Sequence, residues 1–179
     1  ADRERILGPD HPDTLTSRGN LAHAYQDAGR LKEAIGLFEQ NLADRERILG
    51  PDHPDTLTSR NNLAHAYQDA GRLKEAIGLF EQNLANRERI LGPDHPDTLT
   101  SRNNLAHAYC SAGRLEQAID LHKKNLTEAL RVLGPDHPNT RIFRNNLVDV
   151  YRAVGRDEDA ETLLDPPSDP DDTDAEAPA

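Results

Sequence analysis

Apolar residues follow a helical spacing in two neighbouring segments of the chain. The first segment carries an apolar stripe made of Leu63, Ala64, Tyr67 and Ala70. The second segment carries a stripe made of Leu73, Ala76, Ile77, Phe80, Leu84 and Leu91. Such spacing is typical of helices that bury one face, and no alternation of β-branched and polar residues indicates a strand. The pattern predicts two antiparallel helices over residues 54–70 and 72–91.

Proline and glycine mark the ends of these helices. Pro54 can occupy the first helical position, where its missing N–H costs nothing. Gly71 can end the first helix in the left-handed conformation that glycine tolerates. Gly50 and Gly92 are each followed by a proline, which cannot continue a helix, so each of them closes a second helix.

The hairpin recurs with a period of 42 residues, since the string Gly-Pro-Asp-His-Pro begins at Gly8, Gly50, Gly92 and Gly134. Residues 1–42 and 43–84 differ only in Gly19 against Asn61, whereas residues 85–126 differ from 43–84 at nine positions. Two nearly identical copies indicate a recent duplication or an assembled consensus. One hairpin cannot bury its apolar faces alone, so neighbouring copies must stack.

The spacing of the core positions resembles the tetratricopeptide repeat signature. The matching positions are Leu63, Ala64, Tyr67, Ala76 and Phe80, with Leu21, Ala22, Tyr25, Ala34 and Phe38 in the first copy and Leu105, Ala106, Tyr109 and Ala118 in the third. The 42-residue period, the Asn-Asn-Leu-Ala run and the Leu-Gly-Pro-Asp-His-Pro linker are similar to the kinesin light chain subtype. The resemblance implies an all-α fold, a right-handed α-solenoid of antiparallel helix hairpins.

This sequence departs from the signature at two positions. The usual aromatic residue near the start of the first helix is replaced by Arg18, Arg60, Arg102 and Arg144. The aromatic residue of the second helix becomes His122 in the third copy and Leu164 in the fourth. We therefore expect looser packing between the third and fourth copies, with faster hydrogen exchange near His122 than near Phe80.

We divide the chain into a repeat array over residues 1–164 and an acidic, proline-rich tail over residues 165–179 that is expected to be disordered. Because Met is absent, we interpret the chain as a piece of a longer protein, and residues 1–11 as the remnant of a preceding helix and its linker. That end exposes Ile6 and Leu7, which favours end-to-end self-association. The predicted hairpins cover residues 12–49, 54–91, 96–133 and 138–164.

Polar residues of the first helices form the candidate binding surface. The resemblance implies that first helices line the concave side of the array. A helical wheel also places His65 almost opposite Leu63 and Tyr67. A ladder of amides can pair with the backbone of an extended peptide, because each amide offers a donor and an acceptor. The predicted groove residues are Thr58, Asn61, Asn62, His65, Gln68, Asp69, Asn103, Asn104, His107, Asn145, Asn146 and Asp149, together with Thr16, Asn20, His23, Gln26, Asp27 and Thr100 at equivalent positions.

Among these residues, Asn61, Asn103 and Asn145 are predicted to contribute most to binding. The competing interpretation is that all of them are merely solvated polar positions.

The histidines fall into two sets. A turn and capping role is predicted for the set that precedes each helix-starting proline, namely His11, His53, His95 and His137. The other set, His23, His65 and His107, is predicted to form a ladder on the exposed face. Metal ligands lie about 2 Å from the ion, whereas neighbouring helices are about 8–10 Å apart, so adjacent rungs would bridge poorly. We therefore predict no metal and no cofactor.

Charge and composition exclude several classes of function. The net charge is −11, and six acids between Asp165 and Glu176 carry more than half of it. Without a basic patch, binding to nucleic acid or to an anionic membrane is not expected. No stretch reaches the about 18 apolar residues of a membrane span. The single Cys110 cannot form an internal disulfide, which fits a reducing cytoplasm.

The sequence thus predicts a protein–protein interaction scaffold that binds a peptide or a partner segment through its groove. It contains no phosphate-binding loop, and Cys110 has no evident base, so an enzyme is not expected. One alternative is a regulatory arm of a larger signal-transduction NTPase, as similar bacterial proteins imply. The excess of Arg over Lys, 17 to 4, also indicates a bacterial source. Another alternative is a self-associating structural array.

Overall fold

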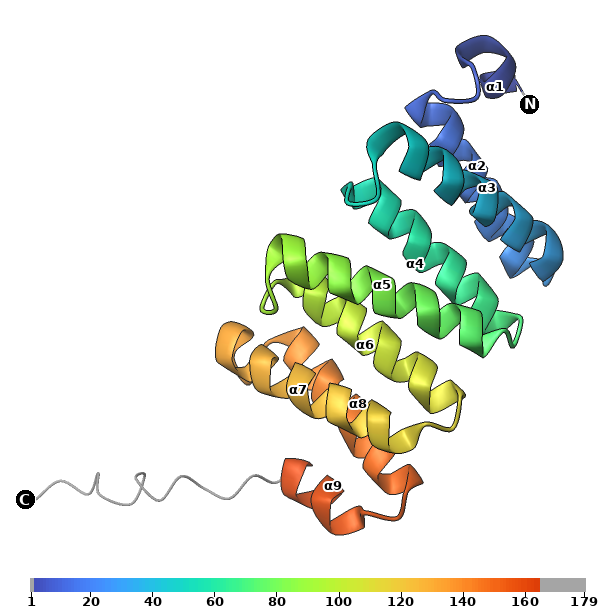
Figure 1. Ribbon diagram of the computed structural model, residues 1–179. Coiled ribbons are helices and arrows are strands. Elements are labelled where there is room, and N and C mark those ends of the chain that lie inside the picture. Colours follow the sequence, from blue (N-terminus) through green and yellow to red (C-terminus); the bar gives the residue numbers. More distant parts are fainter. Residues whose placement is uncertain (1, 165–179) are drawn as a thin grey trace, which may run out of the picture.

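The computed structural model describes residues 2–164, which form helices joined by short turns (Figure 1). Helices alternate in direction along the chain, and no strand occurs in this range. The predicted fold, an all-α right-handed α-solenoid of helix hairpins, is confirmed. The tail predicted at residues 165–179 lies outside the described residues. The helices are α1 Asp2–Leu7, α2 Pro12–Asp27, α3 Leu31–Leu49, α4 Pro54–Asp69, α5 Leu73–Leu91, α6 Pro96–Ser111, α7 Leu115–Leu133, α8 Pro138–Ala153 and α9 Asp157–Leu164.

Each first helix begins at the proline that the sequence indicates. The histidine before that proline has extended backbone and caps the helix with its side chain. In the second copy, the backbone N–H of Asp55 donates to Nδ1 of His53 at 3.1 Å, which satisfies one of the free donors of the first turn. The capping role of His11, His53, His95 and His137 is thereby confirmed.

Two kinds of glycine end the helices. Gly71 follows α4 with φ at 72°, in the left-handed region where a Cβ would be strained. Gly50 follows α3 with φ at 87° and ψ at 164°, a combination that is nearly restricted to glycine. These residues turn the chain sharply enough for consecutive helices to run antiparallel.

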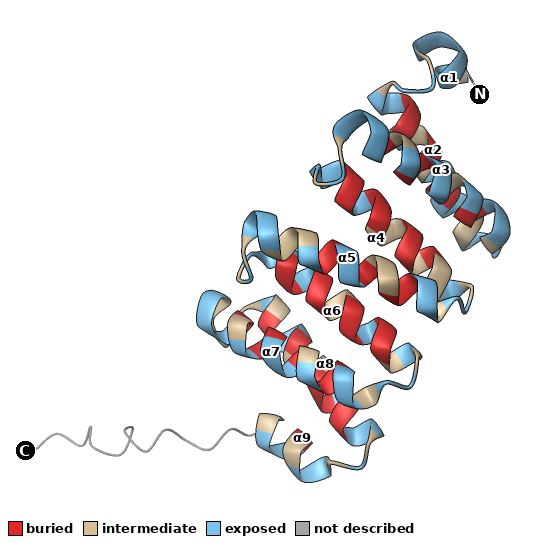
Figure 2. Cartoon of the chain, viewed as in Figure 1, coloured by how far each residue is buried: buried red, intermediate tan, exposed pale blue. Residues whose placement is uncertain are grey.

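Each first helix lies between two second helices, and each helix packs mainly on the one before it and the one after it. On α4, Leu63 joins the apolar cluster that contains Phe38 of α3, whereas Ala64 joins the cluster that contains Phe80 of α5. The helices α4 and α6 therefore contain more buried residues than α2, and Figure 2 shows red segments along both. The apolar core therefore consists of two clusters, which meet at the partly buried Tyr67 and Leu79.

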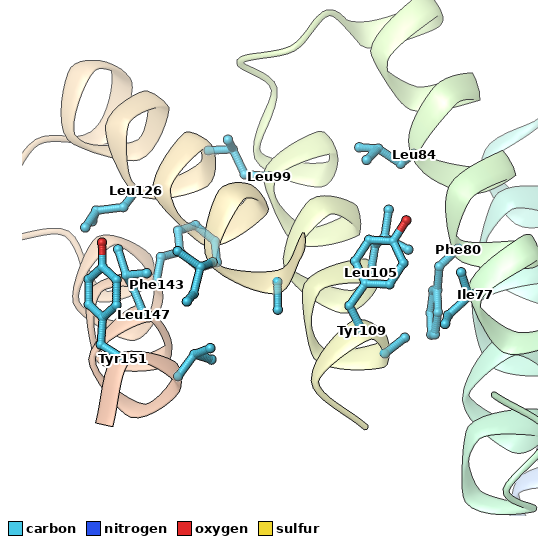
Figure 3. Close-up of a cluster of buried hydrophobic side chains, with 14 of the residues drawn as sticks. Ile77, Phe80, Leu84, Leu99, Leu105, Tyr109, Leu126, Phe143, Leu147 and Tyr151 are labelled. Atoms are coloured by element: carbon cyan, nitrogen blue, oxygen red, sulfur yellow. The ribbon is translucent and has the colours of Figure 1, made fainter. Parts of the chain in front are cut away.

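The tyrosines of the signature bridge neighbouring repeats. Figure 3 shows Tyr109 beside Ile77 and Phe80 of the preceding second helix. Its hydroxyl donates to Oε1 of Glu81 at 2.7 Å, and the guanidinium of Arg114 lies 4.2 Å from the ring centroid. Tyr109 is buried and Tyr67 is half-buried, as the predicted core stripe requires. The stripe of the second helix is wrong at its last residue, because Leu91 is 39% exposed at the end of α5.

The arginine at the expected aromatic position is buried and forms an ion pair with a more exposed glutamate of the preceding repeat. Arg102 of α6 has no exposed surface, and its Nη2 donates to Oε1 of Glu88 on α5 at 2.8 Å. Arg60 and Glu46 make the same contact at 2.7 Å. Removing one partner of such a pair is strongly destabilising, because it leaves a buried charge. Where α7 meets α8, Arg144 is equivalent to Arg102, but the position equivalent to Glu88 holds Leu130. This third junction between repeats therefore lacks the ion pair.

The first and last described helices differ in how far they cover the apolar residues of their neighbours. At the C-terminal end, α9 is short and acidic, and an exposed Glu161 stands at the position equivalent to Ile77. At the N-terminal end, Leu21 is 48% exposed, whereas its equivalents Leu63 and Leu105 are each 4% exposed. The difference arises because α3 and α5 cover the latter two, while only the short α1 precedes α2. No helix within residues 2–164 has the length and apolar content needed to cross a membrane.

Leu21 and Leu63 provide a matched test of the stacking. We expect Leu63→Ala to lower the free energy of unfolding by about 2–5 kcal/mol, because it opens a cavity against α3. Leu21→Ala removes the same atoms from an exposed position and should cost less than about 1 kcal/mol. Urea unfolding followed by circular dichroism at 222 nm measures both. Equal losses in the two variants would contradict the assignment of Leu63 to the interface.

Candidate functional site

The polar residues of the first helices lie in a narrow arc between their two covered flanks. On α4, Thr58 and Asp69 are exposed, whereas Asn61, Asn62 and Gln68 are half-buried. The arc is narrow because α3 covers one side of α4 and α5 covers the other. The half-buried amides therefore lie where consecutive first helices approach each other.

Asparagine side chains from consecutive first helices bond to one another. The Nδ2 of Asn104 on α6 donates to Oδ1 of Asn61 on α4 at 2.9 Å. The Nδ2 of Asn146 on α8 donates to Oδ1 of Asn103 on α6 at 2.8 Å. We call these two bonded pairs the amide rungs. Among the described residues, each rung leaves one N–H₂ group, on Asn61 or Asn103, and one carbonyl oxygen, on Asn104 or Asn146, without a partner.

A second row of contacts runs along the C-terminal ends of the first helices. The Nε2 of Gln26 donates to Oδ2 of Asp69 at 2.5 Å, and the Nε2 of Gln68 donates to Oγ of Ser111 at 2.9 Å. The partners are 43 residues apart, as in the amide rungs. The amide rungs thus join α4 to α6 and α6 to α8, and the second row joins α2 to α4 and α4 to α6, so both rows hold the polar side chains in defined positions.

Sequence reasoning placed the amides on the correct helices but missed that they pair. The signal was present in the Asn-Asn dipeptide and the 42-residue period, because the second Asn of one copy is 43 residues from the first Asn of the copy before. Gly19 removes the first Asn from copy one, so Asn62 lacks the corresponding partner. At the other end, Asn145 and Asp149 of α8 are exposed, and Asn145 makes no side-chain hydrogen bond among the described residues.

The histidine ladder requires a correction. The ring of His65 packs edge-on against Phe80 of its own repeat, with centroids 5.0 Å apart, and His23 meets Phe38 in the same way at 4.9 Å. His65 is half-buried, and burial lowers its pKa. The helical wheel assumed one covered face, whereas the second helix of the same repeat also covers this flank. The correction concerns His65, since His23 and His107 are exposed as predicted.

His122 occupies the core position of Phe80 in the third copy. It is fully buried, its ring packs against His107 with centroids 5.5 Å apart, and neither ring nitrogen has a hydrogen-bond partner in the described range. Burial lowers the pKa of His122 to about 4, and the neighbouring His107 adds to the shift. The ring is therefore neutral at pH 7.

No residues gather for metal binding or covalent catalysis in the part of the chain that the structure describes. Within residues 2–164, no three His, Cys, Asp or Glu side chains lie close enough to share a metal ion. Burial raises the pKa of Cys110, which disfavours the reactive thiolate. The surface of the first helices thus offers hydrogen bonds and not bond-forming chemistry.

The chain belongs to the tetratricopeptide repeat family, whose model matches residues 1–43, 16–88, 58–127 and 102–165. Its structural neighbours are repeats of the kinesin light chain type. A Podosopora anserina kinesin light chain-type protein with nearly identical TPR-like repeats is 35% identical, with a TM-score of 0.76 over 86% of this chain and 73% of that chain. A variant of that protein is 33% identical, with a TM-score of 0.81 over 90% of this chain and 76% of that chain.

The fold extends to more distant proteins. BtubC (BKLC) from P. vanneervenii is 24% identical and has a TM-score of 0.75 over 86% of this chain and 62% of that chain. No curated protein sequence matches this chain. Tetratricopeptide repeats are interaction modules, so the chain is a protein-interaction scaffold, and no catalytic family is indicated.

His122 makes stability depend on pH. Its pKa is near 6.5 in the unfolded chain and about 4 in the folded chain, so only the unfolded state gains this proton between those values. We expect the free energy of unfolding to fall by roughly 2–4 kcal/mol from this residue between pH 6.5 and pH 4, and by nothing further below pH 4.

His122→Phe restores the residue of the first two copies and isolates this contribution from that of the carboxylates. Urea unfolding at several pH values should show the variant less sensitive to acid than the wild-type chain. Parallel pH profiles for the two proteins would mean that His122 does not titrate with a lowered pKa.

Proposed function

We propose that the groove of α2, α4, α6 and α8 binds an extended segment of a partner protein through the amide rungs. The supporting observation is that each rung presents one free N–H₂ group and one free carbonyl oxygen. An extended peptide backbone offers the complementary acceptor and donor, so it can bond to a rung with little dependence on sequence.

The bonds within the rungs make this surface ready for binding. Each asparagine already holds a fixed conformation, because one of its groups bonds to the neighbouring helix. Less side-chain entropy is then lost when a peptide docks. Exposed side chains beside the rungs supply the selectivity among peptide sequences. They are Asp69 on α4, and Ile142 and Arg152 on α8.

Three asparagines test the groove directly. A random peptide display library sorted on the wild-type chain supplies the probes. We expect Asn61→Ala, Asn103→Ala and Asn145→Ala together to weaken peptides bound in the groove at least tenfold, because each lost hydrogen bond contributes about 1 kcal/mol. Fluorescence anisotropy measures the affinity, and circular dichroism checks that the fold persists.

Two further variants separate binding from folding. Gln40→Ala with Gln82→Ala removes exposed amides from the second helices and should leave affinity unchanged. Asn145→Ala alone tests the groove without breaking a rung, since Asn145 belongs to neither of them. The proposal is wrong if every selected peptide binds the folded triple variant as tightly as it binds the wild-type chain.

A second candidate function is end-to-end association, which the exposed N-terminal face supports. Leu21 lies there with Leu37 beside a pocket of about 160 Å³, and its equivalents elsewhere are covered by a second helix. Burying Leu21 against another chain would remove apolar surface from water.

Sedimentation velocity over a range of concentrations tests this association. We expect the wild-type chain to form larger species as its concentration rises and Leu21→Glu to remain monomeric, because the charge would have to be buried. Leu21 is largely exposed in the monomer, so the substitution should not disturb the fold. A wild-type chain that stays monomeric at about 100 μM, a concentration at which contacts with Kd values in the micromolar range would be populated, would exclude this function.

A further inference from the structure

Exposed apolar residues recur at one edge of the array, at the C-terminal ends of the second helices. These ends lie along the same side of the molecule as the loops that lead to the next first helix (Figure 1). Single exposed apolar residues are ordinary, but here the 42-residue repeat aligns them along one edge, where neighbouring pairs can contact one ligand. We call Ile48 and Leu49 of α3 and Ile90 and Leu91 of α5, each 36–42% exposed, the apolar edge.

Each pair of the apolar edge borders a pocket, and the two pockets are equivalent. The first has a volume of about 240 Å³, with Leu15 of α2 beside Ile48 and Leu49. The second has a volume of about 160 Å³, with Leu57 of α4 beside Ile90 and Leu91. Each is large enough for an apolar side chain of a ligand, and the repeat sets their relative position.

The rims of the two pockets carry accessible carboxylates. Asp55 borders the first pocket and Asp97 the second, and neither side chain forms an ion pair among the described residues. The nearby guanidiniums are less exposed than these aspartates: Arg45 is buried and its Nη1 donates to the carbonyl oxygen of Asp55 at 2.9 Å, and Arg87 is half-buried and its Nη1 donates to that of Asp97 at 2.9 Å. A ligand approaching from solvent therefore meets the exposed carboxylate before the arginine.

The next junction changes this chemistry. Its equivalent positions hold Ala129 in place of the arginine, Asn139 in place of the aspartate, and Val132 and Leu133 in place of the apolar pair. The apolar character continues while both charges disappear. The same apolar and charged set also occurs where α1 meets α2, as Arg3, Ile6, Leu7 and Asp13, so these features coincide at that junction and at the two junctions whose pockets are described above.

We propose that the apolar edge is a second docking surface, for a basic amphipathic segment of a partner protein. Apolar side chains of that segment enter the two pockets, and its Lys or Arg side chains pair with Asp55 and Asp97. Because the pockets belong to one rigid array, a segment that fills both gains from a high effective concentration after the first contact. This surface is separate from the amide rungs, although Thr58 lines the second pocket as well as the groove.

Charge favours this occupant over two others. An anionic bilayer would be repelled by a chain with a net charge of −11. A second copy meeting the edge face to face would bring Asp55 and Asp97 against like charges. A cationic segment is attracted instead, and its encounter rate falls as salt rises.

The same peptide display library provides the test, with clones classified by the variant that abolishes their binding. We expect one class to lose at least tenfold in affinity for Ile48→Ser with Ile90→Ser, yet to bind the triple asparagine variant unchanged. Its peptides should carry Lys or Arg next to Leu, Ile or Phe. Clones sensitive only to the asparagines test the groove, so either proposal can fail alone.

Charge variants that preserve the apolar residues complete the test. Asp55→Asn with Asp97→Asn should weaken this class three- to tenfold at low salt, and the difference should shrink in 0.5 M salt, where charges are screened over roughly 4 Å. The fourth copy already holds Asn139 at this position, so the fold accepts the change. The control is Asp120→Asn, which removes an exposed carboxylate of α7 outside both pockets and should have no effect.

Three results would overturn the proposal. The first is a library without edge-dependent clones, or with edge-dependent clones that lack basic residues. The second is binding to phosphatidylserine vesicles that Ile48→Ser with Ile90→Ser abolishes, which would assign the edge to a membrane. The third is a dimer in sedimentation that the same substitutions dissolve, which would assign it to a second copy.

Discussion

The insertion of each first helix between two second helices is the contact on which the rest of the structure depends. Leu63 is buried because α3 covers it, and Ala64 is buried because α5 covers the adjoining side. A single hairpin would leave one of these sides in water, so the stability of a copy depends on its neighbours. The exposure of Leu21, at the one first helix that lacks a full predecessor, shows what that contact contributes.

Stacking also determines where polar groups can lie. Between the covered flanks of α4 and α6 only a narrow arc remains, and there the asparagines meet in rungs. Inside the junction, Arg102 reaches Glu88 of the previous repeat, a contact that a single hairpin cannot make. Because such a pair gains little over an apolar contact but loses much when broken, it favours the correct neighbour more than it adds stability.

Divergence among the copies changes the chemistry of the array from one end to the other. The first two copies keep Phe38 and Phe80 in the core, while the third has the unpartnered His122. The junction of α7 and α8 also lacks the arginine–glutamate ion pair, since Leu130 replaces the glutamate. The surfaces change with the core, because α8 presents Ile142 and Arg152 where earlier copies present Thr and Gln or Cys. A partner therefore meets a different surface at each end, which can define the direction in which it binds.

The sequence by itself determined the repeat, the ends of the helices and the apolar stripe. Proline, glycine and the capping histidine act on the few residues around them, and the stripe needs only the period of a helix. The tertiary structure decided which polar residues pair, which flank covers His65, and which apolar residues stay exposed. A helical wheel describes one isolated helix with one buried face, whereas α4 has two. The partners of Asn61 and Arg60 lie in neighbouring repeats, so these contacts exist only once the hairpins have stacked, whereas His65 meets Phe80 when its own hairpin closes.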